Sequence, residues 1–272
     1  DVYKRQEYII GEGYHIYKSE AVGTAALGGV IPQTVPVLED GSIDIEVAIG
    51  KVKSDDMHFP RTKLLCLENT YNGKPLSPKY MQCATAAARK VNLRSHLDGA
   101  RLMNAAIANK CTPRELASSF DTVSLCLSKG LGAPVGSVLV GNQDFINEAR
   151  RVRKMLGGGM RQAGILAACG IVAMKNQVDR LIQDHALAAR LASELAQIPD
   201  IETEPQGANT NMVFIKVEHK HRAPLQNFLK EEGILIGGRP PTFRLVLHRD
   251  ITENDVNKTV SSIAKFFRGL SY

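Results

Sequence analysis

The stretch SLCLSKGLGAPVG, residues 124–136, brings Lys129 out of an apolar run and into a glycine-rich turn. A short apolar run bounded by glycine and proline is typical of a buried strand in an α/β protein. We therefore expect Lys129 to be half-desolvated at the end of a strand. Loss of hydration favours the neutral amine, which is the form that attacks an aldehyde.

A second strand-like segment, residues 91–97, runs into Asp98 and Arg101. In an open parallel α/β sheet, ligands bind at the edge formed by the carboxyl ends of the strands. Asp98 and Lys129 are therefore expected at one site, although they are distant in sequence. Taken singly, each has an ordinary interpretation, as a turn or capping aspartate and as a surface lysine. Their combination with glycine-rich continuations favours a functional site.

An acid and an amine at one sheet edge are what pyridoxal phosphate requires. The lysine holds this cofactor as a Schiff base, and the carboxylate keeps the pyridine nitrogen protonated so that the ring accepts electrons. Arg101 adds a cationic fork for a carboxylate or for the ring oxygen. These three residues predict a pyridoxal-phosphate site.

Three motifs carry a family resemblance: HLDGAR (96–101), CLSKGLGAPVGSV (126–138) and RKMLGGGMRQAG (153–164). They resemble the low-specificity L-threonine aldolases, and the similarity runs from about residue 8 to the C-terminus. The resemblance implies an α/β fold of the aspartate-aminotransferase type, with a three-layer αβα large domain, a mostly parallel sheet and a small C-terminal α+β domain. It also implies a lyase that cleaves L-threonine or L-allo-threonine to glycine and an aldehyde.

The resemblance assigns roles to further residues. His15 matches a histidine that stacks on the cofactor ring, and Arg244 matches the arginine that binds the substrate carboxylate. Lys154 and Arg161 match cations that reach the cofactor phosphate of a neighbouring subunit. A homo-oligomer, a dimer of dimers with shared active sites, is therefore implied. Without the resemblance, His15 would be an ordinary surface or half-buried histidine, and the sequence around Arg244 would not decide between a site residue and a solvent-facing one. Lys154 and Arg161 would equally flank a flexible elbow between two helices.

Two positions depart from the family pattern. Ser19 stands where an aromatic residue is usual, and Tyr71 stands where a histidine is expected near the substrate β-hydroxyl. Tyr71 can contact the substrate, but with an ordinary pKa near 10 it is a poor base at neutral pH. Tyr71 or a water molecule would have to take the β-hydroxyl proton.

The chain is expected to divide into three parts. Residues 1–6 are interpreted as a non-native leader, residues 7–175 as an N-terminally incomplete cofactor-binding domain, and residues 176–272 as a connecting helix and small domain. The resemblance implies an upstream segment that carries a phosphate-binding turn and a serine of the carboxylate site.

Composition sets further limits. The 272 residues are 44% hydrophobic, enough for one sizeable core or for a large and a small domain. The net charge is +6, but the lysines and arginines are interleaved with acidic residues. This pattern does not favour a nucleic-acid surface. Five cysteines without metal-ligand spacing favour reduced thiols in the cytoplasm, and no membrane-length apolar run is present.

Strands and helices are expected to alternate before a smaller lobe. The expected strands are 7–10, 34–37, 63–68, 136–140, 211–218, 234–236 and 242–248, besides those that carry Asp98 and Lys129. The expected helices are 21–27, 44–53, 78–90, 143–155, 223–232 and 253–267, with a short helix opened by 112–115 and a long helical connection over 162–198.

Three other functions stay open. Another pyridoxal-phosphate reaction, such as β-elimination or transamination, would use the same Asp98 and Lys129. A non-enzymatic homologue would lack cofactor binding. A nucleotide-binding α/β protein is disfavoured because no glycine-rich turn follows the first strand.

Overall fold

The computed structural model describes residues 6–204 and 209–270. Residues 1–5 of the expected leader lie outside the described residues, and Gln6 is the first residue of β1. The chain forms two compact units, one ending at Asn176 and the other beginning at Gln177. Each unit is described separately.

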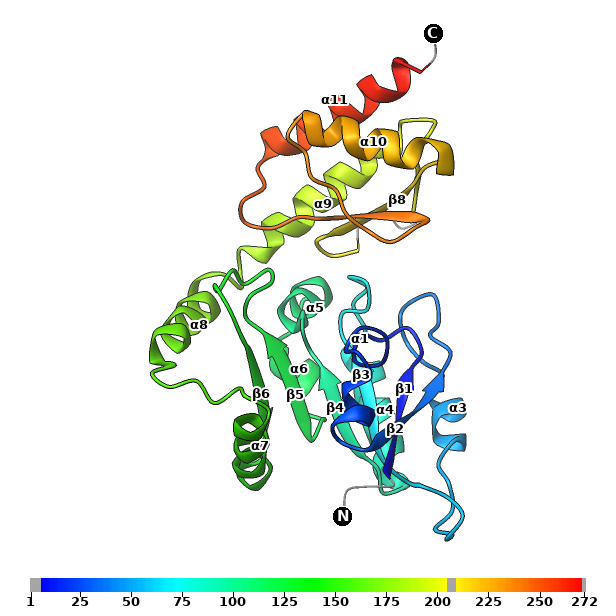
Figure 1. The fold of residues 1–272 in the computed structure, drawn as a ribbon, viewed down its shortest axis with the longest axis vertical. Coiled ribbons are helices and arrows are strands. Elements are labelled where there is room, and N and C mark those ends of the chain that lie inside the picture. The colour runs from blue at the N-terminus through cyan, green and yellow to red at the C-terminus, as the bar shows by residue number, and fades with distance from the viewer. Residues whose placement is uncertain (1–5, 205–208, 271–272) are drawn as a thin grey trace. The chain divides into compact units, whose positions relative to one another are not determined.

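The first unit contains a six-stranded sheet with the order β2-β1-β3-β4-β5-β6 (Figure 1). Every neighbouring pair is parallel except β5 and β6, so the expected mostly parallel sheet is confirmed. The strands are β1 (Gln6–Gly11), β2 (Val30–Val35), β3 (Arg61–Glu68), β4 (Arg94–Asp98), β5 (Thr122–Cys126) and β6 (Ser137–Gly141).

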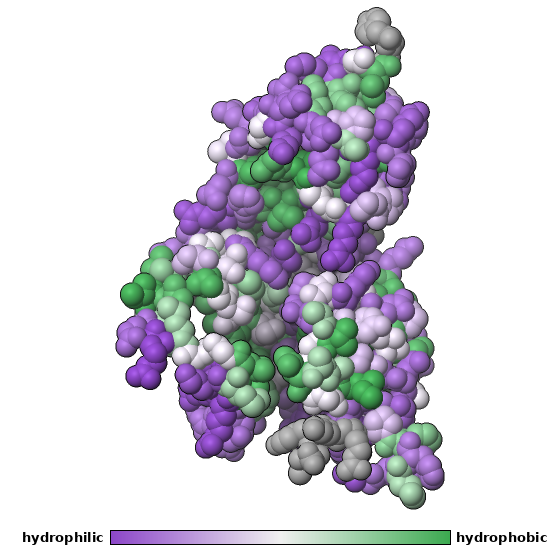
Figure 2. All heavy atoms as spheres, viewed as in Figure 1, coloured by the Kyte–Doolittle hydropathy of each residue, from purple (hydrophilic) through white to green (hydrophobic). Residues whose placement is uncertain are grey.

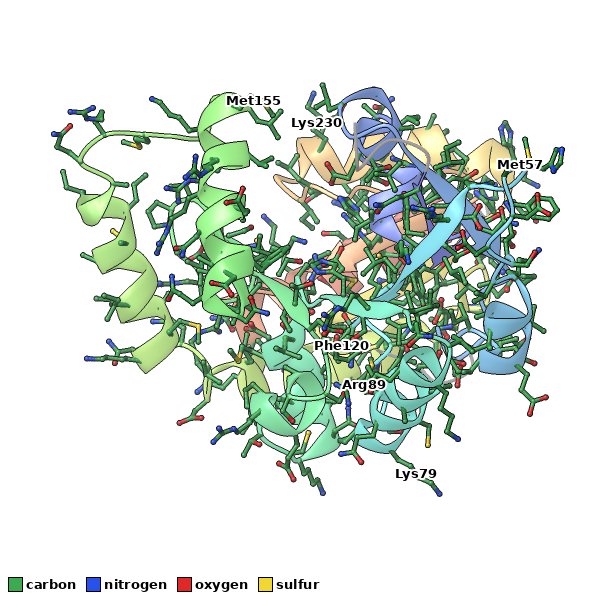
Figure 3. The ribbon with its side chains drawn as sticks, turned by 90° about the horizontal axis from the view of Figure 1, so that it is seen from below. Met57, Lys79, Arg89, Phe120, Met155 and Lys230 are labelled. Atoms are coloured by element: carbon green, nitrogen blue, oxygen red, sulfur yellow. The ribbon has the colours of Figure 1, made fainter. Side chains whose placement is uncertain are left out.

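Helices cover both faces of this sheet, which gives the predicted three layers. In Figure 3, Lys79 and Arg89 of α4 lie on one side of the sheet and Met155 of α7 lies on the other. The helices are α1 (His15–Lys18), α2 (Gly23–Ala26), α3 (Ile45–Gly50), α4 (Pro78–Lys90), α5 (Leu102–Asn109), α6 (Pro113–Ala117), α7 (Gln143–Met155) and α8 (Gly164–Asn176).

Central strands of the sheet are buried on both faces, as parallel sheets require. Ile9 and Ile10 of β1, Leu65 of β3 and Leu97 of β4 are fully buried. Burial on both faces fixes these strands, so the residues at their carboxyl ends are held by a rigid support.

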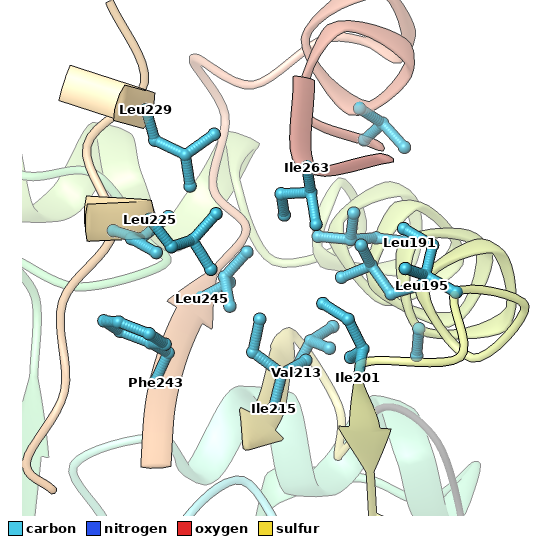
Figure 4. Close-up of a cluster of buried hydrophobic side chains, with 14 of the residues drawn as sticks. Leu191, Leu195, Ile201, Val213, Ile215, Leu225, Leu229, Phe243, Leu245 and Ile263 are labelled. Carbon is cyan, nitrogen blue, oxygen red and sulfur yellow. The ribbon is translucent and has the colours of Figure 1, made fainter. Parts of the chain in front are cut away.

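The second unit packs helices on a small antiparallel sheet with the order β7-β8-β9. Leu225 and Leu229 of the helices meet Val213, Ile215 and Phe243 of the strands in one buried cluster (Figure 4). This is the predicted α+β lobe. Its elements are α9 (Leu181–Leu195), β7 (Glu202–Thr203), β8 (Met212–Lys216), α10 (His219–Glu231), β9 (Thr242–Val246) and α11 (Glu253–Arg268).

Several expected bounds were wrong. The strand expected at 34–37 begins at Val30, because β2 is an edge strand and tolerates the missing N–H of Pro32. The long helical connection expected over 162–198 consists of two helices, α8 and α9, separated by a turn. Residues 234–236 form no strand; Leu235 is 83% exposed and only Gly237 bridges to β9.

Candidate active site

Two carboxyl side chains share the carboxyl edge of the large sheet. β3 ends at Glu68 and β4 ends at Asp98, and these two residues are register partners. Asp98 is 7% exposed, and its Oδ1 accepts a 3.1 Å hydrogen bond from the N–H of Ala100. The strands therefore place two acids side by side where ligands bind in parallel sheets.

Lys129 follows β5, the next strand of the same sheet, by three residues. Its side chain is exposed, so the expected half-desolvation is wrong. The turn explains the difference: the N–H of Gly132 donates to the carbonyl of Lys129, and that of Ala133 donates to Leu127. Leu127 and Ala133 are buried by this turn, while Lys129 lies at its outer part.

Glu68 is the titratable group on which these residues converge. Burial raises the pKa of Glu68 to about 7, and the neighbouring charge of Asp98 acts in the same direction. A hydrogen bond from the N–H of His15 and the charges of Lys129 and Arg101 oppose this shift. The charges of Asp98, Lys129 and Arg101 therefore all act on the Glu68 carboxyl. Sequence reasoning assigned Glu68 no role, although an acid that closes a buried strand was a usable signal.

Arg101 follows the end of β4 by three residues. It is half-buried at the start of α5. A small pocket beside it is lined in part by Ala100, Cys126 and Gly130, so the segment after Asp98 lies against the residues that flank Lys129. The two predicted motifs meet here.

His15 opens α1, beside the end of β3. Its backbone N–H donates a 2.6 Å hydrogen bond to Oε2 of Glu68, and its imidazole Nε2 lies 2.7 Å from Oε1 of Glu20. The imidazole is exposed. Ser19, at the other end of α1, is exposed as well.

Tyr71 is held by packing near the same edge. Its ring lies 5.5 Å from that of Tyr14, centroid to centroid, and a Cβ added at Gly13 would overlap the Tyr71 hydroxyl. Burial raises the pKa of Tyr71, and the nearby Glu68 raises it further. Tyr71 is therefore protonated throughout the neutral range.

Three other predicted site residues belong to elements outside the β3, β4 and β5 strand ends. Lys154 is in the last turn of α7 and Arg161 lies beyond Gly159, and both are exposed in the first unit. Arg244 is an exposed residue of β9 in the second unit, paired in register with Phe214.

Cys126 lies at the end of β5. Burial raises the pKa of Cys126, but hydrogen bonds with Ser128 and the charge of Lys129 outweigh it and lower the pKa overall. All five cysteines are free. Within residues 6–204 and 209–270, no three His, Cys, Asp or Glu side chains are grouped to hold a metal ion. No helix in these ranges is both long and apolar enough to span a membrane.

The gathered side chains fit pyridoxal phosphate by their chemistry. Asp98 is a buried carboxylate suited to a protonated ring nitrogen, Lys129 is an accessible primary amine, and Arg101 is a cation suited to an anionic substituent. These are the side chains expected of an enzyme that uses this cofactor.

Solved structures share the fold. A putative aromatic amino acid beta-eliminating lyase/threonine aldolase from Exiguobacterium matches with a TM-score of 0.79 and 19% identity, over 97% of this chain and 76% of that chain. A threonine aldolase from Leishmania major matches with a TM-score of 0.78 and 21% identity, over 96% and 77%. These likenesses establish the aspartate-aminotransferase type of fold predicted from the motifs.

Sequence comparison gives the family. Residues 2–218 match the beta-eliminating lyase family, and the chain belongs to it. The chain is 45% identical over 251 residues to the low specificity L-threonine aldolase of Escherichia coli K12, covering 92% of this chain and 74% of that relative. It is 42% identical over 264 residues to low-specificity L-threonine aldolase 1 of Arabidopsis thaliana, covering 94% and 74%. The resemblance drawn from the three motifs is confirmed.

Proposed function

We propose that this protein is a pyridoxal-phosphate-dependent aldehyde-lyase that cleaves L-threonine and L-allo-threonine to glycine and an aldehyde. One observation carries the proposal: at the carboxyl edge of the sheet Asp98 pairs in register with Glu68, and Arg101 lies in one pocket with Cys126 and Gly130, which flank Lys129. Relatives at 45% and 42% identity that are named low-specificity L-threonine aldolases support the substrate class.

The cofactor-binding residues proposed here follow the chemistry of each group. When bound, pyridoxal phosphate supplies an electron sink for the bond that breaks at Cα. Lys129 would hold the cofactor covalently, Asp98 would face the ring nitrogen, and Arg101 would face the ring oxygen. His15 would stack on the ring from α1.

Substrate binding is assigned to cations and to the end of β3. Arg244 and Arg101 would bind the α-carboxylate, for which a guanidinium offers two parallel donors. Tyr71 would border the β-hydroxyl. Retro-aldol cleavage also requires a group that accepts the β-hydroxyl proton, and Tyr71, Glu68 and water are the candidates at this edge.

Lys154 and Arg161 are proposed to bind the cofactor phosphate of a second subunit. The exposed apolar surface of the first unit supports assembly: Ile165 and Ile171 of α8 are 75% and 56% exposed, and Figure 2 shows hydrophobic atoms at the surface where α8 lies. Patches of this kind mark protein interfaces. A homo-oligomer, as a dimer of dimers in the cytoplasm, is the assembly we propose.

The test is to add pyridoxal phosphate to the purified chain and to look for a visible absorbance band that borohydride reduces. L-threonine and L-allo-threonine should then give equal amounts of glycine and acetaldehyde. A chain that stays colourless would refute cofactor binding.

A second reaction is supported by Tyr71, which stands where the family histidine is expected. β-Elimination would release ammonia and a keto acid, and transamination would release a keto acid alone. Either product in place of glycine would overturn the aldolase assignment but keep the cofactor site.

A further inference from the structure

Glu68 lies at the carboxyl end of β3 and is contacted there by residues of two other segments. It is the last residue of β3, it pairs in register with Asp98, and its Oε2 accepts the 2.6 Å hydrogen bond from the N–H of His15. The carboxyl is thus held by the backbone of His15, proposed to stack on the cofactor ring, and its residue is the register partner of Asp98, proposed to face the ring nitrogen. Only one of its oxygens is used by His15.

We propose that Glu68 is the catalytic base that accepts the proton of the substrate β-hydroxyl, directly or through one water molecule. This inference rests on the proposed function and assigns its proton acceptor to one residue. Tyr71, which the sequence suggested for this step, then has a packing role.

The packing of Tyr71 supports this division of roles. Its half-buried ring is flanked by Gly13, Tyr14 and Gly41, and a Cβ at Gly41 would lie 3.0 Å from the Tyr71 Cβ. Tyr14 is itself fixed, because its hydroxyl donates a 3.0 Å hydrogen bond to the carbonyl of Gly41. The tyrosine therefore has little freedom to follow a reacting substrate.

The protonation states favour Glu68 as well. With a pKa raised to about 7 by burial, the Glu68 carboxyl is partly ionised at neutral pH, and such a group both accepts and releases a proton readily. Tyr71 has a raised pKa because of burial and of Glu68, so its phenolate is scarce. Between these two groups, the carboxylate is the effective base.

The charged groups around Glu68 come from every neighbouring element. Asp98 on β4 favours the protonated carboxyl, while Lys129 after β5 and Arg101 before α5 favour the ionised form. The His15 N–H on α1 also favours the ionised form, and Tyr71 is the titratable neighbour after β3. Burial exceeds these opposing effects.

Cleavage transfers one proton to Glu68 and one electron pair to Cα. The O–H bond at the β-carbon breaks, its proton goes to the Glu68 carboxylate, and its electron pair forms the carbonyl of the aldehyde. The Cα–Cβ pair moves to Cα, which later takes one proton from solvent. Glu68 releases its proton to solvent, so no net proton is gained or lost.

The decisive variant is Glu68→Gln, whose amide oxygen can still accept the His15 hydrogen bond. We expect kcat for L-threonine cleavage to fall at least about 100-fold, with KM within about threefold and the visible cofactor band unchanged. Tyr71→Phe should lower kcat by less than about fivefold, and Glu39→Gln, at an exposed loop carboxyl, is the matched control. Glu68→Gln activity near wild type, or a larger loss in Tyr71→Phe, would overturn the proposal.

A readout without cofactor tests the same carboxyl. Because the folded-state pKa of Glu68 lies above its ordinary 4.5, the stability that protonated Glu68 contributes is present below pH 4.5 and is lost as the pH rises through about 7. The Tm of the cofactor-free wild type should therefore fall relative to that of Glu68→Gln across this window, and not relative to Glu39→Gln. A constant Tm difference would refute the buried, proton-holding carboxyl.

The two proposals fail in different ways. If wild type forms the cofactor band but produces no glycine, the proposed function is wrong and the base assignment falls with it. If wild type cleaves threonine and Glu68→Gln does so equally well, only the base assignment is wrong.

Discussion

Glu68 and Asp98 are register partners at the last position where β3 pairs with β4. Two acids on adjacent strands of a buried sheet repel each other when both are ionised, and Asp98 raises the pKa of Glu68. Proton uptake at Glu68 and the ring-nitrogen contact proposed for Asp98 are therefore coupled. A change at Asp98 should therefore alter the pKa of Glu68.

Asp98→Asn tests this coupling. Removing the negative charge should lower the pKa of Glu68, because its like-charged neighbour is gone. The pH window in which the cofactor-free chain loses stability should shift to lower pH. The Tm measured from pH 4 to pH 8 checks this, and an unchanged window would show that the two carboxyls do not interact.

Lys129→Ala should abolish the visible band that borohydride reduces, because no other amine is proposed to bind the cofactor. It should also raise the pKa of Glu68, since the Lys129 charge lowers it. Lys154→Ala is the comparison: it removes a proposed phosphate contact but leaves the amine at position 129. A full band in Lys129→Ala would disprove the covalent assignment.

The part of the fold that local sequence determines was predicted well. Helix α4 has the predicted bounds because Ser77 caps it and Pro78 takes its first position. Helix α7 likewise begins after Asn142, whose side chain accepts the N–H of Phe145. Elements bounded by such caps need no tertiary information.

Tertiary context explains the failures. Residues 234–236 have strand composition, but no neighbouring strand pairs with them, and Pro240 and Pro241 follow with no N–H to donate. The exposure of Lys129 depends on a turn beyond the strand end, which apolar pattern does not determine. Glu68 was missed because its importance comes from β4, a strand that follows it in the chain by about two dozen residues.

Gly13→Ala should disturb the packing of Tyr71, because the new Cβ would overlap the tyrosine hydroxyl. We expect a loss of about 1–3 kcal/mol in the free energy of unfolding. Adding Tyr71→Phe should recover part of this loss, since the hydroxyl is removed. Gly23→Ala, where a Cβ has open space, serves as the control. Equal losses at both glycines would contradict the predicted overlap.

Leu229→Ala should destabilise the second unit by about 2–5 kcal/mol, because it leaves a cavity in the buried cluster of Figure 4. Leu229 is fully buried, whereas Leu235 in the same unit is 83% exposed. Leu235→Ala should therefore change stability by no more than about 0.5 kcal/mol. Urea unfolding of the two variants measures the difference, and similar values would argue against the packing of α10.

Glu7 and Lys53 form a partly buried ion pair near the amino ends of β1 and β3, where Glu7 pairs in register with Thr62. Glu7 is 1% exposed; its Oε2 lies 2.6 Å from Nζ of Lys53, and its Oε1 accepts a 2.6 Å hydrogen bond from the hydroxyl of Thr62. The N–H of Lys53 donates to the same hydroxyl at 3.1 Å. Lys53→Met would leave a buried carboxylate without its cation.

Removing one member of a buried pair costs about 3–5 kcal/mol, more than replacing both members. We therefore expect Lys53→Met alone to destabilise the first unit by about 3 kcal/mol. Lys53→Met with Glu7→Gln should lose less than Lys53→Met alone, since the amide carries no charge and still accepts from Thr62. Lys63→Met changes an exposed lysine of β3 and should be nearly neutral. Urea unfolding of wild type, Lys53→Met, Glu7→Gln and the double variant gives the coupling energy, and strictly additive losses would mean that Glu7 and Lys53 do not act as a pair.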